Sequence, residues 1–387
     1  MDALEYAREL IAFDSVSRNT NADIAERVES MLKRLGFETE RIEYDDASGL
    51  RKVSLVARKG PAVSGGLAYF GHTDVVPADD WFDGTPGPFS PVVSENRLYG
   101  RGSCDMKGSL AAMLAASERY ETTALARPLY FVATADEEVG FLGAKEVAAR
   151  STLYGELKDG RAAGIIGEPT NLQVVTAHKG SCAIRAVSVG EAAHSSSADG
   201  RNANRAMIPF LGEMLAIERE TETSPAWQDD RFSPATLSWN IGINDHNTAI
   251  NVKAARSICT VYLRPMPGMD VSPLVNRCRE AAERYGLAFD VFFEARPFST
   301  DPNSDVVRDL LALAGADSPQ TVCYGTDGAV FSELGRCVVC GPGDIAQAHT
   351  RDEWIALEQL QDGTDLYARA IQHWCVAPED QEAIRKP

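Results

Sequence analysis

Histidine, aspartate and glutamate residues stand at positions in this sequence where short apolar runs end or a helix is expected to begin. They are His72, Asp74, Asp105, Glu137, Glu138, Glu168 and His349. One such residue alone is more often structural than a ligand. Together, two imidazoles and several carboxylates, with no cysteine among them, form a donor set that suits Zn²⁺, Co²⁺ or Mn²⁺. We therefore expect a metal site.

Asp105 lies in the loop R-L-Y-G-R-G-S-C-D-M-K-G, just before a predicted helix. Its two carboxylate oxygens could bridge two ions, which gives each ion three protein ligands and leaves room for a shared water. A pair of ions lowers the pKa of such a water, so that hydroxide becomes available near neutral pH. Asp74, two residues after His72, is placed to accept the free imidazole N–H of that histidine and orient its ring.

Glu137 and Glu138 are adjacent, shortly after the apolar run L-Y-F-V-A-T. An acidic pair in an acidic protein is often only a solvated loop. Consecutive residues of extended backbone point to opposite sides, however, so Glu138 could ligate an ion while Glu137 faces the water. Two divalent cations would outweigh the repulsion between the two carboxylates, and without metal we expect that repulsion to raise the pKa of one of them.

The elements that must position these residues are short strands that alternate with helices. Strands are predicted at 53–58, 66–70, 129–134 and 163–167, and helices at 106–120 and 143–150. This alternation is typical of an α/β fold in which a mostly parallel sheet has helices on both faces. Ligands of such sheets bind beyond the carboxyl ends of the strands, which is where the candidate residues stand.

The pattern changes at about residue 178. A strand, a helix, two strands, a helix and a last strand are predicted at 182–189, 203–215, 236–243, 255–264, 271–285 and 289–294. This β-α-β-β-α-β order suits an inserted α+β domain of the split βαβ type. After about Pro297 the α/β rhythm resumes, with a closing helix near 355–374. We therefore predict a catalytic domain over 1–177 and 295–387, interrupted by a lid and dimerisation domain over 178–294.

Composition narrows the choice of partners. The chain has 387 residues, 44% of them hydrophobic, and a formal net charge of −18, which argues against nucleic acid and anionic membranes as partners.

No signal peptide or membrane-spanning segment is recognisable, and eight cysteines fit a reducing compartment, so we expect a cytoplasmic protein. Cys337 and Cys340 form a C-x-x-C, which could serve redox chemistry or a metal. We assign them to the core, because they lie in a predicted strand where residues three apart face opposite ways.

Five motifs, taken together and in this order, resemble those of the dinuclear metallopeptidase and deacylase family. They are H-T-D-V-V-P, G-R-G-S-C-D-M-K-G, T-A-D-E-E-V-G, I-G-E-P-T and A-H-T-R-D-E-W. The family includes acetylornithine deacetylases, succinyl-diaminopimelate desuccinylases, aminoacylases and bacterial glutamate carboxypeptidases. The resemblance covers nearly the whole chain.

The resemblance implies two divalent metal ions, Zn²⁺ first with Co²⁺ or Mn²⁺ as alternatives. It implies that one ion is held by His72, Asp105 and Glu168, and the other by Asp105, Glu138 and His349. Glu137 would be the general base. The family also has a cis peptide bond after the bridging aspartate, which here is the bond between Asp105 and Met106.

The resemblance extends to residues of the inserted segment and of the loop after it. In A-A-H-S-S-S-A-D-G-R-N-A, His194 matches a histidine that reaches the active site of a partner subunit and helps to stabilise the oxyanion, which implies a homodimer through the inserted domain. Asn251 and Arg264 match residues that hold the carboxylate of the substrate, and Gly325 and Thr326 lie in a loop that contacts it. The alternatives are a loop-capping histidine for His194 and an ordinary strand-end cation for Arg264.

Within the family, the stretches I-I-G-E-P-T-N-L-Q-V-V-T-A-H-K-G and L-R-P-M-P-G-M are most similar to acetylornithine deacetylases, whereas Y-G-T-D-G is closer to the desuccinylases. The resemblance thus implies hydrolysis of a small N-acyl amino acid, N2-acetylornithine first. Succinyl-diaminopimelate desuccinylase and dipeptidase or carboxypeptidase activities stay open as alternatives. A non-catalytic amino-acid-binding protein is a further alternative, against which the intact Glu137 argues.

Overall fold

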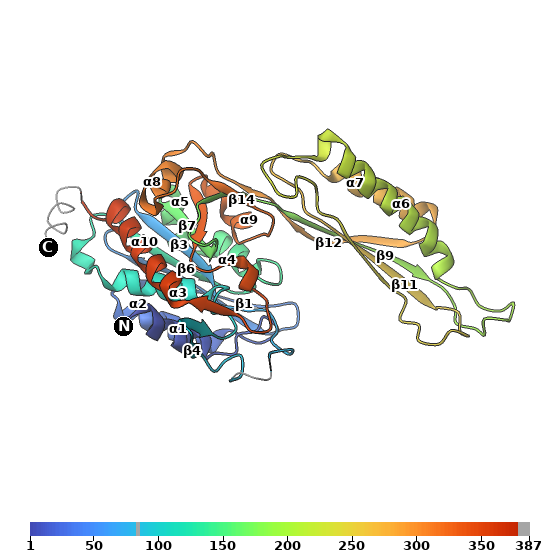
Figure 1. Ribbon diagram of the computed structural model, residues 1–387, viewed down its shortest axis with the longest axis horizontal. Helices are drawn as coiled ribbons and strands as arrows, with labels where there is room; N and C mark the ends of the chain where they lie inside the picture. The colour runs from blue at the N-terminus through green and yellow to red at the C-terminus, as the bar shows by residue number, and fades with distance from the viewer. Residues whose placement is uncertain (83–85, 378–387) are drawn as a thin grey trace. The chain divides into compact units, whose positions relative to one another are not determined.

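The computed structural model describes residues 1–82 and 86–377 (Figure 1), so the last ten residues of the predicted catalytic domain lie outside the described chain. The chain divides into two compact units, which we call the large unit and the small unit. The large unit comprises Met1–Thr176, Ser299–Gln320 and Thr326–Pro387, and the small unit Ala177–Phe298 and Thr321–Gly325. The predicted insertion, 178–294, falls within the small unit, which also takes in 321–325.

The large unit is built on a nine-stranded sheet in the order β1-β2-β6-β3-β7-β15-β8-β13, with β14 paired to β8. These strands are β1 Glu38–Asp45, β2 Arg51–Lys59, β3 Leu67–His72, β6 Leu129–Thr134, β7 Ala163–Pro169, β8 Val175–His178, β13 Phe298–Ser299, β14 Gln320–Val322 and β15 Cys337–Gly341. The four central strands, β6, β3, β7 and β15, are parallel, whereas the pairs β1–β2, β2–β6 and β15–β8 are antiparallel. A separate three-stranded sheet joins β16 Trp354–Ala356, β5 Arg97–Tyr99 and β4 Val92–Ser94.

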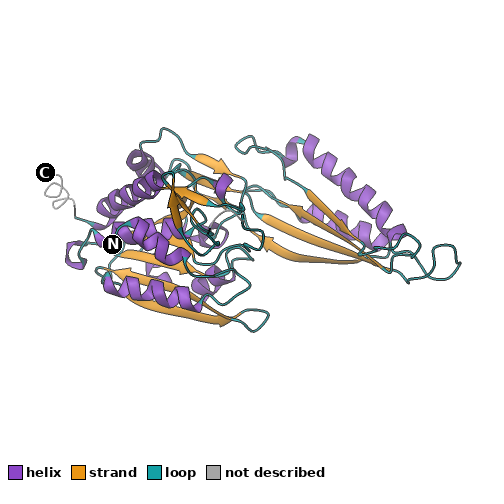
Figure 2. Cartoon of the chain, turned by 60° about the horizontal axis from the view of Figure 1, so that its bottom comes forward, coloured by secondary structure: helices purple, strands orange, loops and turns teal. Residues whose placement is uncertain are grey.

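Helices cover both faces of the large sheet, which confirms the predicted fold class. One face carries α1 Ala3–Ile11, α2 Ala22–Arg34, α3 Lys107–Glu118, α8 Asp305–Ala314 and α10 Leu357–Cys375. The other carries α4 Leu142–Arg150, α5 Thr152–Asp159 and α9 Gly328–Phe331 (Figures 1 and 2). Because the central strands are sandwiched between these layers, every residue of β3, β6 and β7 is buried, as expected for parallel strands covered on both sides.

Helix α3 lies deepest among these helices. Its sequence K-G-S-L-A-A-M-L-A-A-S is buried on every side, since the helix packs against the sheet and is flanked by α1 and α10. The small alanine side chains allow this close approach on several sides at once. The helix that follows Asp105 is therefore tightly packed between the sheet and its two neighbouring helices.

The parallel register brings the candidate residues to one edge. His72, the last residue of β3, is paired with Thr134, the last residue of β6. Glu168 lies near the end of β7, and the neighbouring β15 ends at Gly341, eight residues before His349. Four strand ends thus deliver side chains to the same edge, as the sequence predicts.

The small unit contains β9 Ser181–Val189, α6 Asn204–Thr223, β10 Asn240–Asn244, β11 Arg256–Leu263, α7 Ser272–Arg284 and β12 Ala288–Ala295. The β-α-β-β-α-β order is confirmed. The sheet order is β10-β11-β9-β12 with antiparallel neighbours, and α6 and α7 lie side by side on one face (Figure 1).

The predicted strand at 236–243 starts later than expected, at Asn240. Ser238 has a φ of 52°, which breaks the extended backbone. The carbonyls of Pro234 and Thr236 accept hydrogen bonds from the Nζ of buried Lys179, at 2.8 and 2.5 Å, instead of joining a ladder.

Cys337 and Cys340 are both fully buried in β15, which confirms their assignment to the core. All eight cysteines are free thiols. Among the helices of residues 1–82 and 86–377, none combines the length and the hydropathy needed to cross a membrane.

The entry into β3 gives a test of the packing. Gly66 has a φ of 88°, and a Cβ atom there would lie 2.0 Å from the carbonyl oxygen of Pro128. Gly49 has a φ of 80° but nothing within 4 Å of its Cβ position. Gly66→Ala should therefore lower the free energy of unfolding by about 2 kcal/mol more than Gly49→Ala, measured by urea denaturation, because both variants share the φ strain and only one has the clash. Equal losses would contradict this packing.

Candidate metal centre

The five predicted ligands converge at the carboxyl edge of the large sheet. The Nε2 atom of His72 lies 3.1 Å from Oδ1 of Asp105 and 3.7 Å from Oε1 of Glu168. The Nε2 atom of His349 lies 3.3 Å from Oδ2 of Asp105 and 3.2 Å from Oε2 of Glu138. The two oxygens of Asp105 thus face two different imidazoles, which is the arrangement that a bridging ligand needs.

The residues present fit divalent cations. Ligand atoms of His72, Glu137 and Glu168 lie within 4.8 Å of one another, as do those of His72, Asp105 and Glu138. Nitrogen and oxygen donors without sulfur suit Zn²⁺, Co²⁺ or Mn²⁺. Burial first, and then the neighbouring carboxylates, raise the pKa of Glu137 and of Glu168 well above the ordinary value. Such a concentration of buried negative charge is what bound cations would neutralise.

In the metal-free protein the histidines supply the positive charge that faces the carboxylates. Hydrogen bonds to Asp105 and Glu138 raise the pKa of His349 to about 10. The same hydrogen bonds have the opposite effect on the pKa of Asp105. Although burial opposes the change, hydrogen bonds from His349 and His72 hold the pKa of Asp105 below its ordinary value. Protonated imidazoles therefore balance the carboxylates, and a metal ion would replace these protons.

Asp74 acts differently from the sequence prediction. The atom within hydrogen-bond distance of His72 Nδ1 is the backbone carbonyl oxygen of Asp74, at 2.9 Å, while Oδ1 of its carboxylate is 3.7 Å away. The carboxylate instead accepts hydrogen bonds from the backbone N–H groups of Glu137 and Glu138, at 3.1 and 3.4 Å, and from the hydroxyl of Ser17, at 2.7 Å. Asp74 thus orients the histidine with its backbone and the glutamate pair with its side chain.

The turn before the glutamate pair is held by residues that the sequence did not reveal. Asp136 has a φ of 58°, and its carboxylate accepts hydrogen bonds from Lys52 Nζ at 2.6 Å and from the Tyr44 hydroxyl at 2.9 Å. Lys52 is only 1% exposed. One feature of the sequence could have indicated this contact. Lys52 directly precedes the apolar run V-S-L-V, and a lysine buried with such a strand needs an acidic partner.

The bond between Asp105 and Met106 is cis, as the resemblance implied. Another buried carboxylate, that of Asp327, accepts a hydrogen bond from the Thr134 hydroxyl at 2.5 Å, and burial raises its pKa to about 7. Thr326, beside it, is fully buried, and its hydroxyl accepts the N–H of Gly328 at 2.9 Å.

The other predicted site residues belong to the small unit: His194, Asn251, Arg264 and Gly325. His194 and Asn251 lie on adjoining exposed loops, where the N–H of Ser195 donates to the carbonyl oxygen of Asn251 at 2.8 Å. The guanidinium of Arg264 lies 5.0 Å from the centroid of the Tyr262 ring. The roles of these four residues at the metal centre stay predictions.

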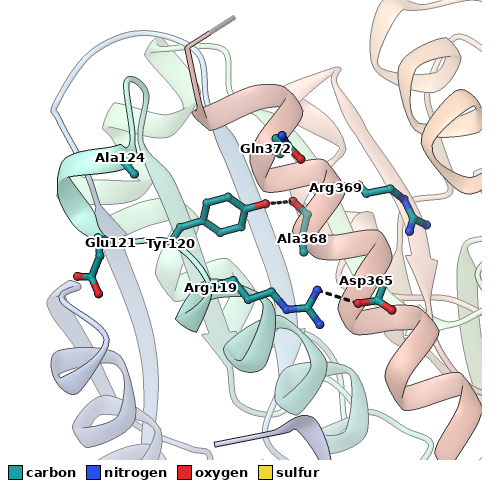
Figure 3. A pocket seen from close by; sticks show the side chains of 8 residues that line it. All are labelled: Arg119, Tyr120, Glu121, Ala124, Asp365, Ala368, Arg369 and Gln372. Atoms are coloured by element: carbon teal, nitrogen blue, oxygen red, sulfur yellow. Dashed lines mark hydrogen bonds and ion pairs between the residues drawn. The ribbon is translucent and has the colours of Figure 1, made fainter. Parts of the chain in front are cut away.

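A surface pocket of about 570 Å³ lies elsewhere on the large unit, around the C-terminal end of α3 and along α10 (Figure 3). Two interactions join residues that line it: Arg119 pairs with Asp365 at 2.7 Å, and the Tyr120 hydroxyl donates to the carbonyl oxygen of Ala368 at 2.7 Å. None of the candidate ligands lines this pocket, so it is not part of the metal centre.

Comparison with known proteins agrees with this geometry. A family model described as Peptidase family M20/M25/M40 matches residues 68–373, which span the strand ends and all the candidate ligands. The chain belongs to this family. It is a metal-dependent amidohydrolase of the M20 type, and the resemblance seen in the sequence is confirmed.

Among curated M20 relatives, the acetylornithine deacetylase of Myxococcus xanthus is 36% identical over 384 residues, covering 95% of this chain and 96% of that protein. The acetylornithine deacetylase of Photorhabdus laumondii is 31% identical and covers 97% of both chains. The solved structure of an M20 family metallo-carboxypeptidase from Sulfolobus solfataricus has a TM-score of 0.75 at 18% identity, covering 96% of this chain and 99% of that one, which shows the shared fold.

The raised pKa values give a test of the M20 site. With a pKa of about 10, the imidazole of His349 carries a proton near neutral pH in the metal-free protein, so metal binding there must release a proton and the apparent affinity should rise with pH between about 6 and 8. Calorimetric titration of the metal-free protein with Zn²⁺, in buffers of different ionisation enthalpy, measures this release. His349→Asn should release about one proton fewer. An apparent binding enthalpy that is the same in every buffer would contradict the prediction.

Proposed function

We propose that this chain hydrolyses the amide bond of N2-acetylornithine to give ornithine and acetate, a step of arginine biosynthesis. The observation that supports hydrolysis is the shared Asp105, whose two oxygens face two imidazoles, with the buried carboxyl of Glu137 in the same cluster. The choice of substrate is supported by the acetylornithine deacetylases at 36% and 31% identity. An acidic protein would also tolerate the cationic side chain of ornithine.

In this proposal His72, Asp105 and Glu168 hold one ion, and Asp105, Glu138 and His349 hold the other. When bound, two divalent ions, Zn²⁺ or else Co²⁺ or Mn²⁺, would polarise the amide carbonyl and make a water molecule acidic.

Glu137 moves the protons of the reaction. A carboxylate oxygen of Glu137 takes a proton from the attacking water and later gives it to the leaving amine. Burial raises the pKa of Glu137 above that of an ordinary glutamate, which brings it closer to the working pH and suits a group that must both accept and donate. Asp74 fixes the backbone on which Glu137 stands, through the 3.1 Å hydrogen bond from the Glu137 N–H.

The small unit contributes substrate contacts in this proposal. Arg264 and Asn251 anchor the α-carboxylate, for which a guanidinium fork is well suited, and Gly325 and Thr326 line the substrate loop. His194, from a neighbouring subunit, stabilises the oxyanion. These roles come from the family resemblance of their motifs.

A second candidate activity is desuccinylation of succinyl-diaminopimelate. It is favoured by the stretch Y-G-T-D-G at 324–328, which is closer to the desuccinylases and includes the buried Asp327. The chemistry at the metals is the same for both substrates, so the acyl group and the amino-acid side chain decide between them.

A substrate panel tests this proposal. The metal-reconstituted enzyme should release acetate from N2-acetylornithine faster than it hydrolyses acetylcitrulline, succinyl-diaminopimelate or simple dipeptides. Turnover of the succinyl compound alone would instead support the second candidate.

A second test is the variant Glu137→Gln. It removes the carboxylate that would carry the proton but keeps the size and shape of the side chain. We expect its kcat to fall by about 10²–10⁴-fold while the bound metal content is unchanged. Near-normal activity of this variant would rule out Glu137 as the base.

We also infer that the protein is a homodimer through the small unit. Ile208 on α6 and Ile243 on β10 are 66% and 61% exposed, and they line one shallow pocket of about 400 Å³ beside the open edge of β10. A second copy of this chain is the occupant that we propose for this face.

Ile208→Glu should therefore shift the protein from dimer to monomer in analytical ultracentrifugation, because a charge would be buried at the contact. Val63→Glu, at a position of the large unit that is 49% exposed, is the control and should leave the mass unchanged. A wild-type protein that is a fully active monomer at assay concentration would exclude a role for His194 across subunits.

A further inference from the structure

The loop that carries Asp105 has no regular structure of its own. Residues 100–106 lie between β5 and α3 as a series of turns, with φ values of 154° at Gly100 and 84° at Gly102. Asp105 is the side chain whose two oxygens face both imidazoles, so a small displacement of this loop would disturb both metal positions at once. Something outside the loop has to fix it.

Glu353 supplies that contact. Its side chain is 1% exposed, and Oε1 accepts hydrogen bonds from the backbone N–H groups of Cys104 and Asp105, at 2.8 and 3.0 Å. Oε2 accepts the N–H of Gly102 at 3.0 Å and Nη1 of Arg101 at 2.8 Å. Each carboxylate oxygen thus receives two donors, and three of the four are backbone groups of the loop itself.

Arg101 anchors this arrangement. Its side chain is 1% exposed, Nη2 donates to the carbonyl oxygen of Pro77 at 3.2 Å, and the guanidinium lies 5.5 Å from the centroid of the Trp81 ring. A buried ion pair is tolerated only when its remaining hydrogen-bonding groups are largely satisfied. The loop amides supply the hydrogen bonds that the carboxylate requires.

Glu353 also lies only four residues after His349, a proposed ligand of the second ion. The segment is tied to the loop a second time, because the carbonyl oxygen of Glu353 accepts the N–H of Gly100 at 3.0 Å. One short segment therefore presents a ligand directly and holds the loop of the shared ligand.

We propose that Glu353 is a positioning residue for the metal centre: with Arg101 it forms a buried clamp that sets Asp105 relative to His349. The clamp consists of hydrogen bonds to Arg101 and to backbone N–H groups of the loop, so Glu353 would act on the ions through Asp105. This inference rests on the metal ligands of the proposed function, and it adds a residue whose substitution alters the geometry of both ions.

Glu353→Gln tests the clamp. The amide is nearly the same size, but its NH₂ group must face either Cys104 and Asp105 or Gly102 and Arg101, and each of these pairs consists only of donors. Two hydrogen bonds are lost in either orientation. We expect the affinity of the metal-free protein for Co²⁺ to fall about 10–100-fold in chelator competition, and the visible absorption spectrum of the bound Co²⁺ to change.

Glu29→Gln is the matched control, because Glu29 is another buried glutamate, with ion pairs to Lys33 and Arg41 between α2 and β1. It should lower the melting temperature without altering Co²⁺ affinity or the spectrum. A folded Glu353→Gln variant with wild-type affinity and spectrum would overturn the clamp.

If Glu353→Gln does not fold, the variant Glu353→Asp provides the test of the clamp. It keeps the charge but is one methylene shorter, so it cannot reach both donor pairs, and we expect an intermediate loss of Co²⁺ affinity with a changed spectrum. Wild-type values for this variant would likewise overturn the clamp. A wild-type protein that binds no Co²⁺ would instead contradict the proposed function, so the two failures are distinguishable.

Discussion

Electrostatic repulsion among buried carboxylates is the constraint that the large unit has to balance. Glu137, Glu138, Glu168 and Asp105 lie together at the end of the central strands, and all are largely removed from water. Two unit charges 4 Å apart repel by about 4 kcal/mol even at an effective dielectric constant of 20. A fold that gathers four of them must supply compensating positive charge or favour their protonated forms. Both responses are present: His349 and His72 hold the pKa of Asp105 below its ordinary value, and burial raises the pKa of Glu137, Glu138 and Glu168.

The carboxylates of this region fall into two groups according to what faces them. Asp74, Asp136 and Glu353 are surrounded by donors of the chain itself, namely backbone N–H groups, hydroxyls, a lysine or an arginine. In the part of the chain that the structure describes, Glu137 and Glu168 have no such donor within hydrogen-bond distance, and Asp105 and Glu138 meet only imidazoles. The first group fixes the backbone, and the second is left available for cations and for proton transfer.

The positions of the carboxylates that are left available for cations were easier to predict from the sequence than the contacts of those that fix the backbone. Candidate ligands such as His72 and Glu168 follow apolar strands, and parallel strands bring their carboxyl ends to one edge, so local pattern and a topological rule were enough to predict that they lie together. The partners Lys52 and Glu353 act across 84 and about 250 residues, and no periodicity links them to the groups that they hold. The same limit applied to Asp74, because only the folded turn decides whether its carbonyl or its carboxylate meets the imidazole. The strand predicted at 236–243 was too long, since the contacts of Lys179 could not be read from spacing.

The long separation between Glu353 and the Asp105 loop has a consequence for biosynthesis. The loop amides of Gly102, Cys104 and Asp105 find their acceptor only when the segment that also contains His349 and β16 has been synthesised and has paired with β5. A chain synthesised only as far as the small unit therefore lacks both the acceptor that orders the Asp105 loop and the candidate ligand His349.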